Sequence, residues 1–143
     1  DSFTLQENNG YLLFKKNCNT CHQEPLFSTY QFANNGLPVD TTLNDFGRWQ
    51  VTGQTKDSLH FKIPSLRNLS YSYPYMHDGR FLSLNGVLEH YNSEVVATQN
   101  LDPQLKGSKL GIALNETEKT KITAFLNTLN DEDFINNKLL AEQ

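Results

Sequence analysis

The sequence predicts a mostly α-helical domain with few helices and long loops. Helical patterns recur near both ends and once in the middle, β-strand patterns are scarce, and an irregular stretch extends from Pro25 to Ser70. A loop section of that length is unusual in a compact domain unless it wraps something. With 143 residues, the chain is expected to form a single domain that covers residues 1–143.

The first helix is predicted in "GYLLFKKNC", residues 10–18. Gly10 and Phe14 lie one turn apart on the same face, and the helix leads directly into the motif C-N-T-C-H. Its last turn is therefore expected to aim Cys18 and Cys21 at whatever they bind. Beyond the motif, glycines and prolines break any regular element, namely Gly36, Pro38, Gly47, Gly53 and Pro64.

A second helix is predicted in "RFLSLNGVLEHYN", residues 80–92, with Ser83 as its N-cap. The apolar residues of this segment recur at helical spacing, at Leu84, Val87, Leu88 and Tyr91. Tyr91 is therefore expected to face inward.

A third helix is predicted after Asn115 and Glu118, which form a capping pair. Its apolar stripe consists of Ile122, Phe125, Leu126 and Leu129, and a weaker helical tail is expected after Asp131. The first and third helices are expected to cross near Gly10 and Phe125, because the small glycine permits a close approach.

Composition limits the kind of partner. Hydrophobic residues make up 37% and charged residues 20%, which is typical of a globular chain, but the mean hydropathy of −0.57 indicates a modest interior that a large apolar cofactor would help to fill. The net charge of −4 and the absence of a basic run argue against nucleic acid. Small molecules or proteins are the expected partners.

No apolar stretch approaches the length of a membrane span, so no membrane-spanning segment is predicted. The opening "DSFTLQENNG" also lacks the basic and apolar regions of a signal peptide. We therefore expect a mature, processed chain or an excised domain.

The motif C-N-T-C-H, residues 18–22, is compatible with three chemistries. A structural zinc site usually needs four Cys or His ligands, but only Cys18, Cys21 and His22 are clustered. A thioredoxin-like dithiol would place its C-x-x-C between a strand and a helix, whereas this motif follows a helix and precedes a loop. The pattern favours neither of these two sites.

Covalent attachment of haem gives every residue of the motif a role. The two thiols add across the two vinyl groups, and the adjacent imidazole ligates iron on the proximal face. The sequence therefore predicts a mostly α cytochrome c-like fold, with long loops wrapping one covalently attached haem c. An incidental pair of buried thiols beside a surface histidine is the alternative.

Six segments resemble one haem protein family more closely than cytochromes c in general. They are "GYLLFKKNCNTCHQEPLFS", "NNGLP", "DFGRWQVTG", "FKIPSLRNLSYSYPYMHDGRF", "GVLEHYN" and "EKTKITAFLNTL". Together they look like the C-terminal haem domain of the MauG and bacterial dihaem cytochrome c peroxidase family. Members normally carry two haem c domains, each with a C-x-x-C-H, whereas this sequence has only one such motif.

The resemblance implies a function for the haem. In this family hydrogen peroxide is activated at the N-terminal haem, while the C-terminal haem is six-coordinate and relays electrons. For this chain the resemblance implies an electron-transfer haem, as a free carrier or as the relay domain of a MauG-like or peroxidase-like assembly. Its partner would be a redox protein or a second haem domain. The enzyme alternative is a single-haem peroxidase with an open or displaceable distal ligand.

The sixth iron ligand has two main candidates. Met76 is the only methionine, and a thioether is the common axial ligand of cytochromes c. The resemblance instead places the distal ligand later, at Tyr91, where MauG has a tyrosine and typical peroxidases have a methionine. An open or His-ligated iron is a further alternative, and Tyr91 would otherwise be a core aromatic.

Other residues are assigned around the haem. Arg67, Asn68 and Arg80 are candidate partners of the propionates, because a guanidinium matches a carboxylate with two hydrogen bonds. His77 is expected to hydrogen bond close to the haem, and Pro64 lies in the same cofactor-binding segment. Two further histidines, His60 and His90, are expected at the surface or behind the ligands.

Three further expectations concern the surroundings. Trp49 is either a haem-packing aromatic or a relay to a partner. The resemblance implies calcium near the backbone carbonyls of Ser72 and Pro74, at a site that the missing domain would complete. Haem attachment through C-x-x-C-H implies a periplasmic or other extracytoplasmic location.

Overall fold

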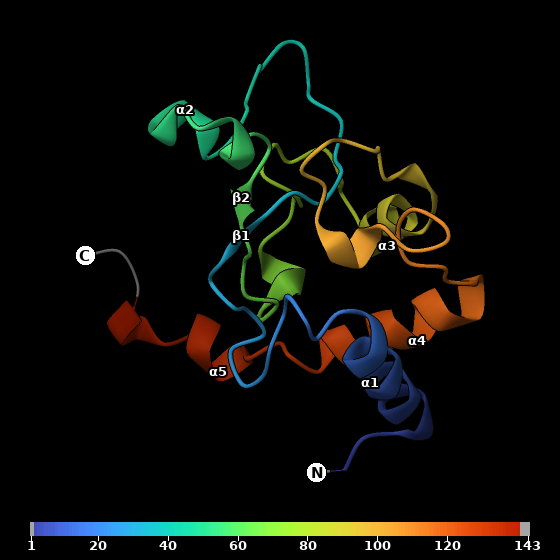
Figure 1. Ribbon diagram of the computed structural model, residues 1–143. Coiled ribbons are helices and arrows are strands. Elements are labelled where there is room, and N and C mark those ends of the chain that lie inside the picture. Colours follow the sequence, from blue (N-terminus) through green and yellow to red (C-terminus); the bar gives the residue numbers. More distant parts are fainter. Residues whose placement is uncertain (1, 141–143) are drawn as a thin grey trace.

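The computed structural model describes residues 2–140 and is mainly helical, with long connecting loops (Figure 1). The α-helices are α1 (Leu5–Asn17), α2 (Trp49–Thr52), α3 (Leu84–Glu89), α4 (Glu116–Asn127) and α5 (Glu132–Ile135). A π-helical turn covers His90–Glu94, and 3-10 turns cover Thr55–Asp57, Leu69–Tyr71, Pro103–Leu105 and Lys138–Leu140. The strands are β1 (Phe32–Ala33) and β2 (Phe61–Lys62).

Helix α1 begins five residues before the predicted start at Gly10. The Thr4 hydroxyl accepts a hydrogen bond from the Glu7 backbone at 3.3 Å, and the Glu7 carboxylate accepts one from the Thr4 backbone at 2.7 Å. This capping box fixes the first turn, whose polar residues carry no apolar periodicity. The helix ends at Asn17, so Cys18 is its C-cap.

Helices α1 and α4 cross as predicted and form the base of the molecule (Figure 1). A Cβ atom on Gly10 would lie 1.9 Å from the Lys121 carbonyl oxygen, so only glycine permits this approach. The Phe14 and Phe125 rings are 5.1 Å apart, and both side chains are almost completely buried. Leu129, predicted on the same stripe, lies beyond the end of α4 but still packs against this core.

Helix α3 begins at the predicted N-cap, since the Ser83 hydroxyl accepts from the Gly86 backbone at 3.2 Å. The chain then widens into the π-helical turn, which the sequence pattern does not reveal. This turn leaves the Tyr91 carbonyl free to accept from the Ile112 backbone at 2.6 Å. A Cβ on Gly111 would lie 2.2 Å from that carbonyl oxygen, so glycine is required at position 111. The backbone of Tyr91 is thus fixed in place.

The predicted irregular stretch between Pro25 and Ser70 contains only short elements. Strands β1 and β2 form an antiparallel ladder that pairs Phe32 with Lys62 and Ala33 with Phe61. This ladder joins two distant parts of the loop. Within residues 2–140, none of the helices has the length and apolar character needed to span a lipid bilayer.

An ion pair with a buried lysine joins α4 to the end of α3. The Lys119 side chain is 2% exposed, and its ammonium donates to the carboxylates of Glu89 and, at 2.7 Å, of Glu116. Hydrogen bonds from Lys119 and then from Ser93 lower the pKa of Glu89 to about 2. Glu89 directly precedes the π-helical turn, so this pair holds the start of that turn against α4.

Glu89 is expected to make the fold sensitive to acid. Its hydrogen bonds lower the pKa to about 2 in the folded protein, against the ordinary value of 4.5 in the unfolded chain. Because the folded pKa is the lower one, this stabilisation is complete above about pH 4.5 and is lost as the pH falls towards 2. Wild-type protein should lose stability across this window in urea titrations, and Glu89→Gln should lose less. An equal slope in both proteins would contradict this role.

Candidate functional site

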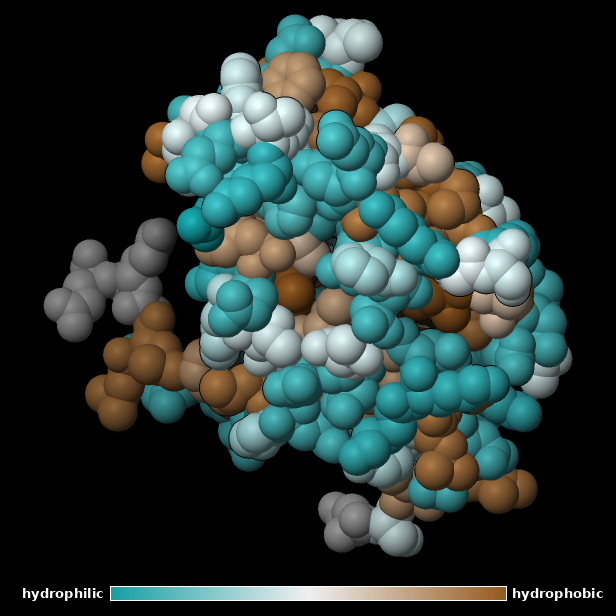
Figure 2. Space-filling view, viewed as in Figure 1, coloured by the Kyte–Doolittle hydropathy of each residue, from teal (hydrophilic) through white to brown (hydrophobic). Residues whose placement is uncertain are grey.

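The main candidate site is a cavity of about 530 Å³ enclosed by α1, α3, α4 and the long loop. Its wall is mostly apolar and includes Phe14, Ile63, Leu84, Leu88, Ile122 and Leu126. Figure 2 shows that hydrophilic residues cover most of one face of the molecule, with hydrophobic residues visible in recesses between them. The volume is within the usual range for cofactor pockets.

The motif residues Cys18, Cys21 and His22 all line this cavity. They form a tight turn directly after α1, in which the backbone N–H groups of Cys21 and His22 donate to the Cys18 carbonyl at 3.2 and 3.0 Å. The Thr29 backbone closes the loop by donating to the Cys21 carbonyl at 3.0 Å. The end of α1 thus aims both thiols as predicted.

The two cysteines are free thiols in a desolvated setting. Burial, followed by the neighbouring Cys21, raises the pKa of Cys18 to about 12. Burial, followed by Asp102, also raises the pKa of Cys21. Zinc binds thiolates, so a zinc ion would have to displace both protons here. Within residues 2–140, no three Cys, His, Asp or Glu side chains converge closely enough to hold a metal ion on their own.

His22 presents one ring nitrogen to the cavity. Its Nδ1 lies 3.2 Å from the carbonyl oxygens of both Phe27 and Pro64, so this nitrogen carries the hydrogen. The Nε2 lone pair is therefore available, which is the usual arrangement of a metal-binding imidazole. Burial lowers the pKa of His22, against the two carbonyl contacts that raise it. The ring is thus held in the neutral form that ligates iron.

The two candidate distal residues line the same cavity. Burial raises the pKa of Tyr91 to about 12, while a hydrogen bond from the Asn35 side chain acts in the opposite direction. The Met76 sulfur accepts a hydrogen bond from the Asn35 amide at 3.5 Å. Met76 also has φ of 71°, in the left-handed region that is uncommon for residues other than glycine.

The loop after Met76 contributes one cavity residue and one that is engaged elsewhere. His77 lines the cavity and stacks on Phe61, with ring centroids 3.6 Å apart. Arg80 lies outside the set of lining residues: its guanidinium donates to the Asp78 carboxylate at 2.5 and 2.8 Å and to the Pro38 carbonyl at 2.8 Å. A propionate contact from Arg80 would require this pairing to be given up.

Of the remaining predicted cofactor residues, two line the cavity and one does not. Pro64 lines the cavity and accepts from His22, and Arg67 also lines it. Asn68 lies outside the lining set, and its side-chain oxygen accepts from the Asp131 backbone at 2.6 Å. In this arrangement Asn68 fastens the loop to the segment after α4, and a propionate contact would compete with that bond.

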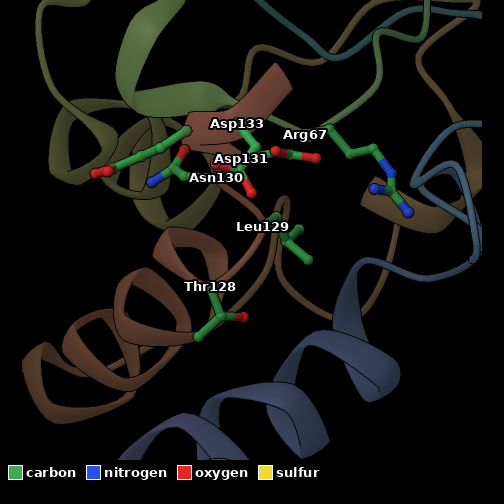
Figure 3. Close-up of a pocket in the computed structure, with 7 residues that line it drawn as sticks. Arg67, Thr128, Leu129, Asn130, Asp131 and Asp133 are labelled. Atoms are coloured by element: carbon green, nitrogen blue, oxygen red, sulfur yellow. The ribbon is translucent and has the colours of Figure 1, made fainter. Parts of the chain in front are cut away.

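A second pocket of about 510 Å³ lies beside Arg67 and the segment from Thr128 to Asp133 (Figure 3). Its wall is predominantly polar and acidic, which does not suit a large apolar cofactor. Figure 3 shows the Arg67 guanidinium turned away from Asp131 and Asp133. It donates instead to the Pro25 carbonyl, at 2.9 and 3.3 Å. The first cavity is therefore the better candidate.

The sequence did not single out Asn35. Asn35 lines the cavity and lies in the quoted segment "NNGLP", whose composition predicts only a turn. His90 is fully buried behind the cavity wall, which is the second of its two predicted places, and its Nε2 donates to the Asn35 carbonyl at 3.1 Å. His60 is half-buried outside the cavity. Trp49 lies on α2, 41% exposed, and does not line the cavity.

Known proteins resemble this chain in sequence and in fold. The methylamine utilization protein MauG of Methylophilus methylotrophus is 36% identical over 126 residues, which are 84% of this chain and 35% of the relative. The cytochrome c551 peroxidase of Nitrosomonas europaea is 35% identical over 132 residues, covering 90% of this chain and 35% of the relative. No protein-family model matches the sequence.

A solved structure has the same fold. The crystal structure of a MauG-like protein associated with microbial copper homeostasis superposes with a TM-score of 0.77, at 28% identity, over 96% of this chain and 50% of that chain. The relatives and the solved structure that match most of this chain are MauG, a MauG-like protein and a bacterial cytochrome c peroxidase. The chain spans about a third of the length of these two relatives.

Proposed function

We propose that this chain is a haem c electron-transfer domain whose iron is ligated by His22 and Tyr91. One observation carries this proposal: a single apolar cavity gathers two neutral thiols, an imidazole with a free Nε2 and a buried phenol. When bound there, haem supplies one-electron transfer at a potential set by its ligands and its burial. The family resemblance and the fit of this cavity support that cofactor.

The chain's own residues would hold the haem in defined ways. Cys18 and Cys21 are proposed as the thioether anchors, because both lie in the turn that ends α1. The carbonyls of Phe27 and Pro64 orient the His22 ring and increase its basicity. Arg67 is the cationic residue proposed to face a propionate, in competition with its bond to the Pro25 carbonyl. The apolar wall excludes water, which limits rearrangement during electron transfer.

Tyr91 is proposed as the distal ligand because its backbone is fixed. The Ile112 N–H bonds its carbonyl, and the π-helical turn sets the direction of its side chain. π-Helical turns inside helices occur frequently at functional sites. A phenolic oxygen ligand favours the ferric state and lowers the potential, whereas a Met76 thioether would raise it.

The rival function is a single-haem peroxidase with an open or displaceable distal ligand. Peroxide chemistry needs a free coordination position and a nearby general acid or base. In this structure two potential ligands line the cavity, and the nearby His77 is stacked on Phe61. These observations favour the electron-transfer function.

The visible and near-infrared spectrum of the ferric protein tests the proposal. We expect a low-spin spectrum without the methionine-to-iron charge-transfer band and without change on addition of peroxide. Tyr91→Phe should alter the spectrum, while Met76→Leu should leave it almost unchanged as the matched control. A charge-transfer band that disappears in Met76→Leu would reassign the ligand, and a high-spin spectrum that responds to peroxide would favour the peroxidase.

The wider context follows from the length of the relatives. We propose that the domain corresponds to the C-terminal, electron-relay part of MauG-like and peroxidase-like proteins, with a second haem domain or a redox protein as its partner. We also propose a periplasmic or other extracytoplasmic location, because haem c is attached there. Calcium near the carbonyls of Ser72 and Pro74 stays a prediction.

A further inference from the structure

The side-chain amide of Asn35 has a defined orientation. Its Oδ1 accepts a hydrogen bond from the Leu37 backbone N–H at 3.2 Å. A backbone N–H is only a donor, so the oxygen must be the atom that faces it. The Nδ2 group, which carries two N–H bonds, is therefore turned towards the cavity.

The side chain of Asn35 shares the cavity wall with both candidate distal ligands. Nδ2 lies 3.5 Å from the Met76 sulfur, and a side-chain hydrogen bond from Asn35 acts to lower the pKa of Tyr91. Asn35 itself is far from Met76 in the sequence, since Met76 lies 41 positions after it. Asn35 is thus the polar group shared by both possible iron ligands.

The backbone around Asn35 is fixed as well. The fully buried His90 donates from Nε2 to the Asn35 carbonyl at 3.1 Å, and His90 directly precedes Tyr91. The side chain of the neighbouring Asn34, also fully buried, accepts from the Gly36 backbone at 2.9 Å. The amide therefore cannot follow a moving ligand, and its hydrogen bonds act at set positions.

We propose that Asn35 is a positioning residue that selects Tyr91 over Met76 as the sixth ligand of the haem iron. A hydrogen bond from an amide stabilises a phenolic oxygen that bears negative charge on iron. A thioether that accepts a hydrogen bond from Nδ2 has one of its two lone pairs engaged by the amide, and this contact holds its sulfur at Asn35. Both effects favour oxygen ligation and a low reduction potential. This inference rests on the proposed haem function of the cavity.

Two substitutions of Asn35 test the selection in the haem-loaded protein. Asn35→Asp keeps an oxygen for the Leu37 N–H but removes both donors, and Asn35→Leu removes them without adding charge. In each variant we expect the methionine-to-iron charge-transfer band to appear where the wild type has none, and the reduction potential to rise. The band should disappear again in Asn35→Leu combined with Met76→Leu.

Asn85→Leu is the matched control, because Asn85 is exposed on α3 and lies outside the cavity wall. This variant should keep the wild-type spectrum and potential. The proposal is overturned if Tyr91→Phe alters the wild-type spectrum but both Asn35 variants keep that spectrum and potential. If Tyr91→Phe has no effect, the ligand assignment itself fails, and the Asn35 proposal fails with it. Covalent haem content, measured for every variant, separates ligand exchange from loss of the cofactor.

Discussion

Replacing both Cys18 and Cys21 with alanine should abolish covalent haem attachment completely. On the proposed assignment each thiol would form one thioether by adding its sulfur and hydrogen across one vinyl group, so without both thiols no bond to the porphyrin would remain. Intact-protein mass spectrometry should show the wild type heavier by one haem and the double variant at its polypeptide mass. Each single variant should keep one thioether and one free vinyl group, which shifts the visible bands of the reduced haem to longer wavelength.

Thr20→Ala is the control for this experiment. Thr20 lies between the two cysteines and lines the cavity, but its side chain has no sulfur and cannot form a thioether. The variant should therefore carry the same covalent haem as the wild type. Covalent haem in the double cysteine variant would refute the thioether assignment. A wild-type protein that binds zinc in a 1:1 ratio, and no haem, would refute the cofactor itself.

The sequence could predict features that depend on neighbouring residues. The capping pair Asn115 and Glu118, the N-cap at Ser83 and the close approach at Gly10 all depend on local spacing or size, and the structure has each of them. The inward direction of Tyr91 follows from the same helical period and is confirmed by its place in the cavity wall. The motif C-x-x-C-H itself predicted the roles of Cys18, Cys21 and His22, and the family resemblance added Tyr91 as the candidate distal ligand.

Other features depend on contacts between distant residues and left no signal in the sequence. Asn35 reaches Met76 only after the loop has folded around the cavity, and the buried His90 bonds the backbone of that same loop. Arg80 shows a different limitation of sequence-based prediction. A guanidinium at this position was predicted to bind a haem propionate, but in this structure it donates to the nearby Asp78 carboxylate instead. Sequence spacing does not rank such competing partners.

Substitution of Gly10 should have a large effect on stability, although glycine is a poor helix former. Alanine would gain about 1 kcal/mol of helix propensity in α1. A methyl group there would lie 1.9 Å from the Lys121 carbonyl oxygen and 2.9 Å from the Phe125 Cβ, so the helices would have to separate. Overpacking of this kind typically costs ~1–3 kcal/mol, and the upper end applies because backbone atoms cannot rotate away.

The clash therefore outweighs the propensity gain, and Gly10→Ala is expected to lower the free energy of unfolding by about 2 kcal/mol. Urea unfolding of the haem-loaded protein, followed by helical circular dichroism, measures this loss as a lower midpoint. Asn8→Ala is the matched control, because it changes propensity on the exposed side of the same helix and should be neutral or stabilising. If Gly10→Ala were as stable as Asn8→Ala, the close crossing of α1 and α4 would be wrong. The turn that aims Cys18 and Cys21 would then lack the fixed base that this crossing provides.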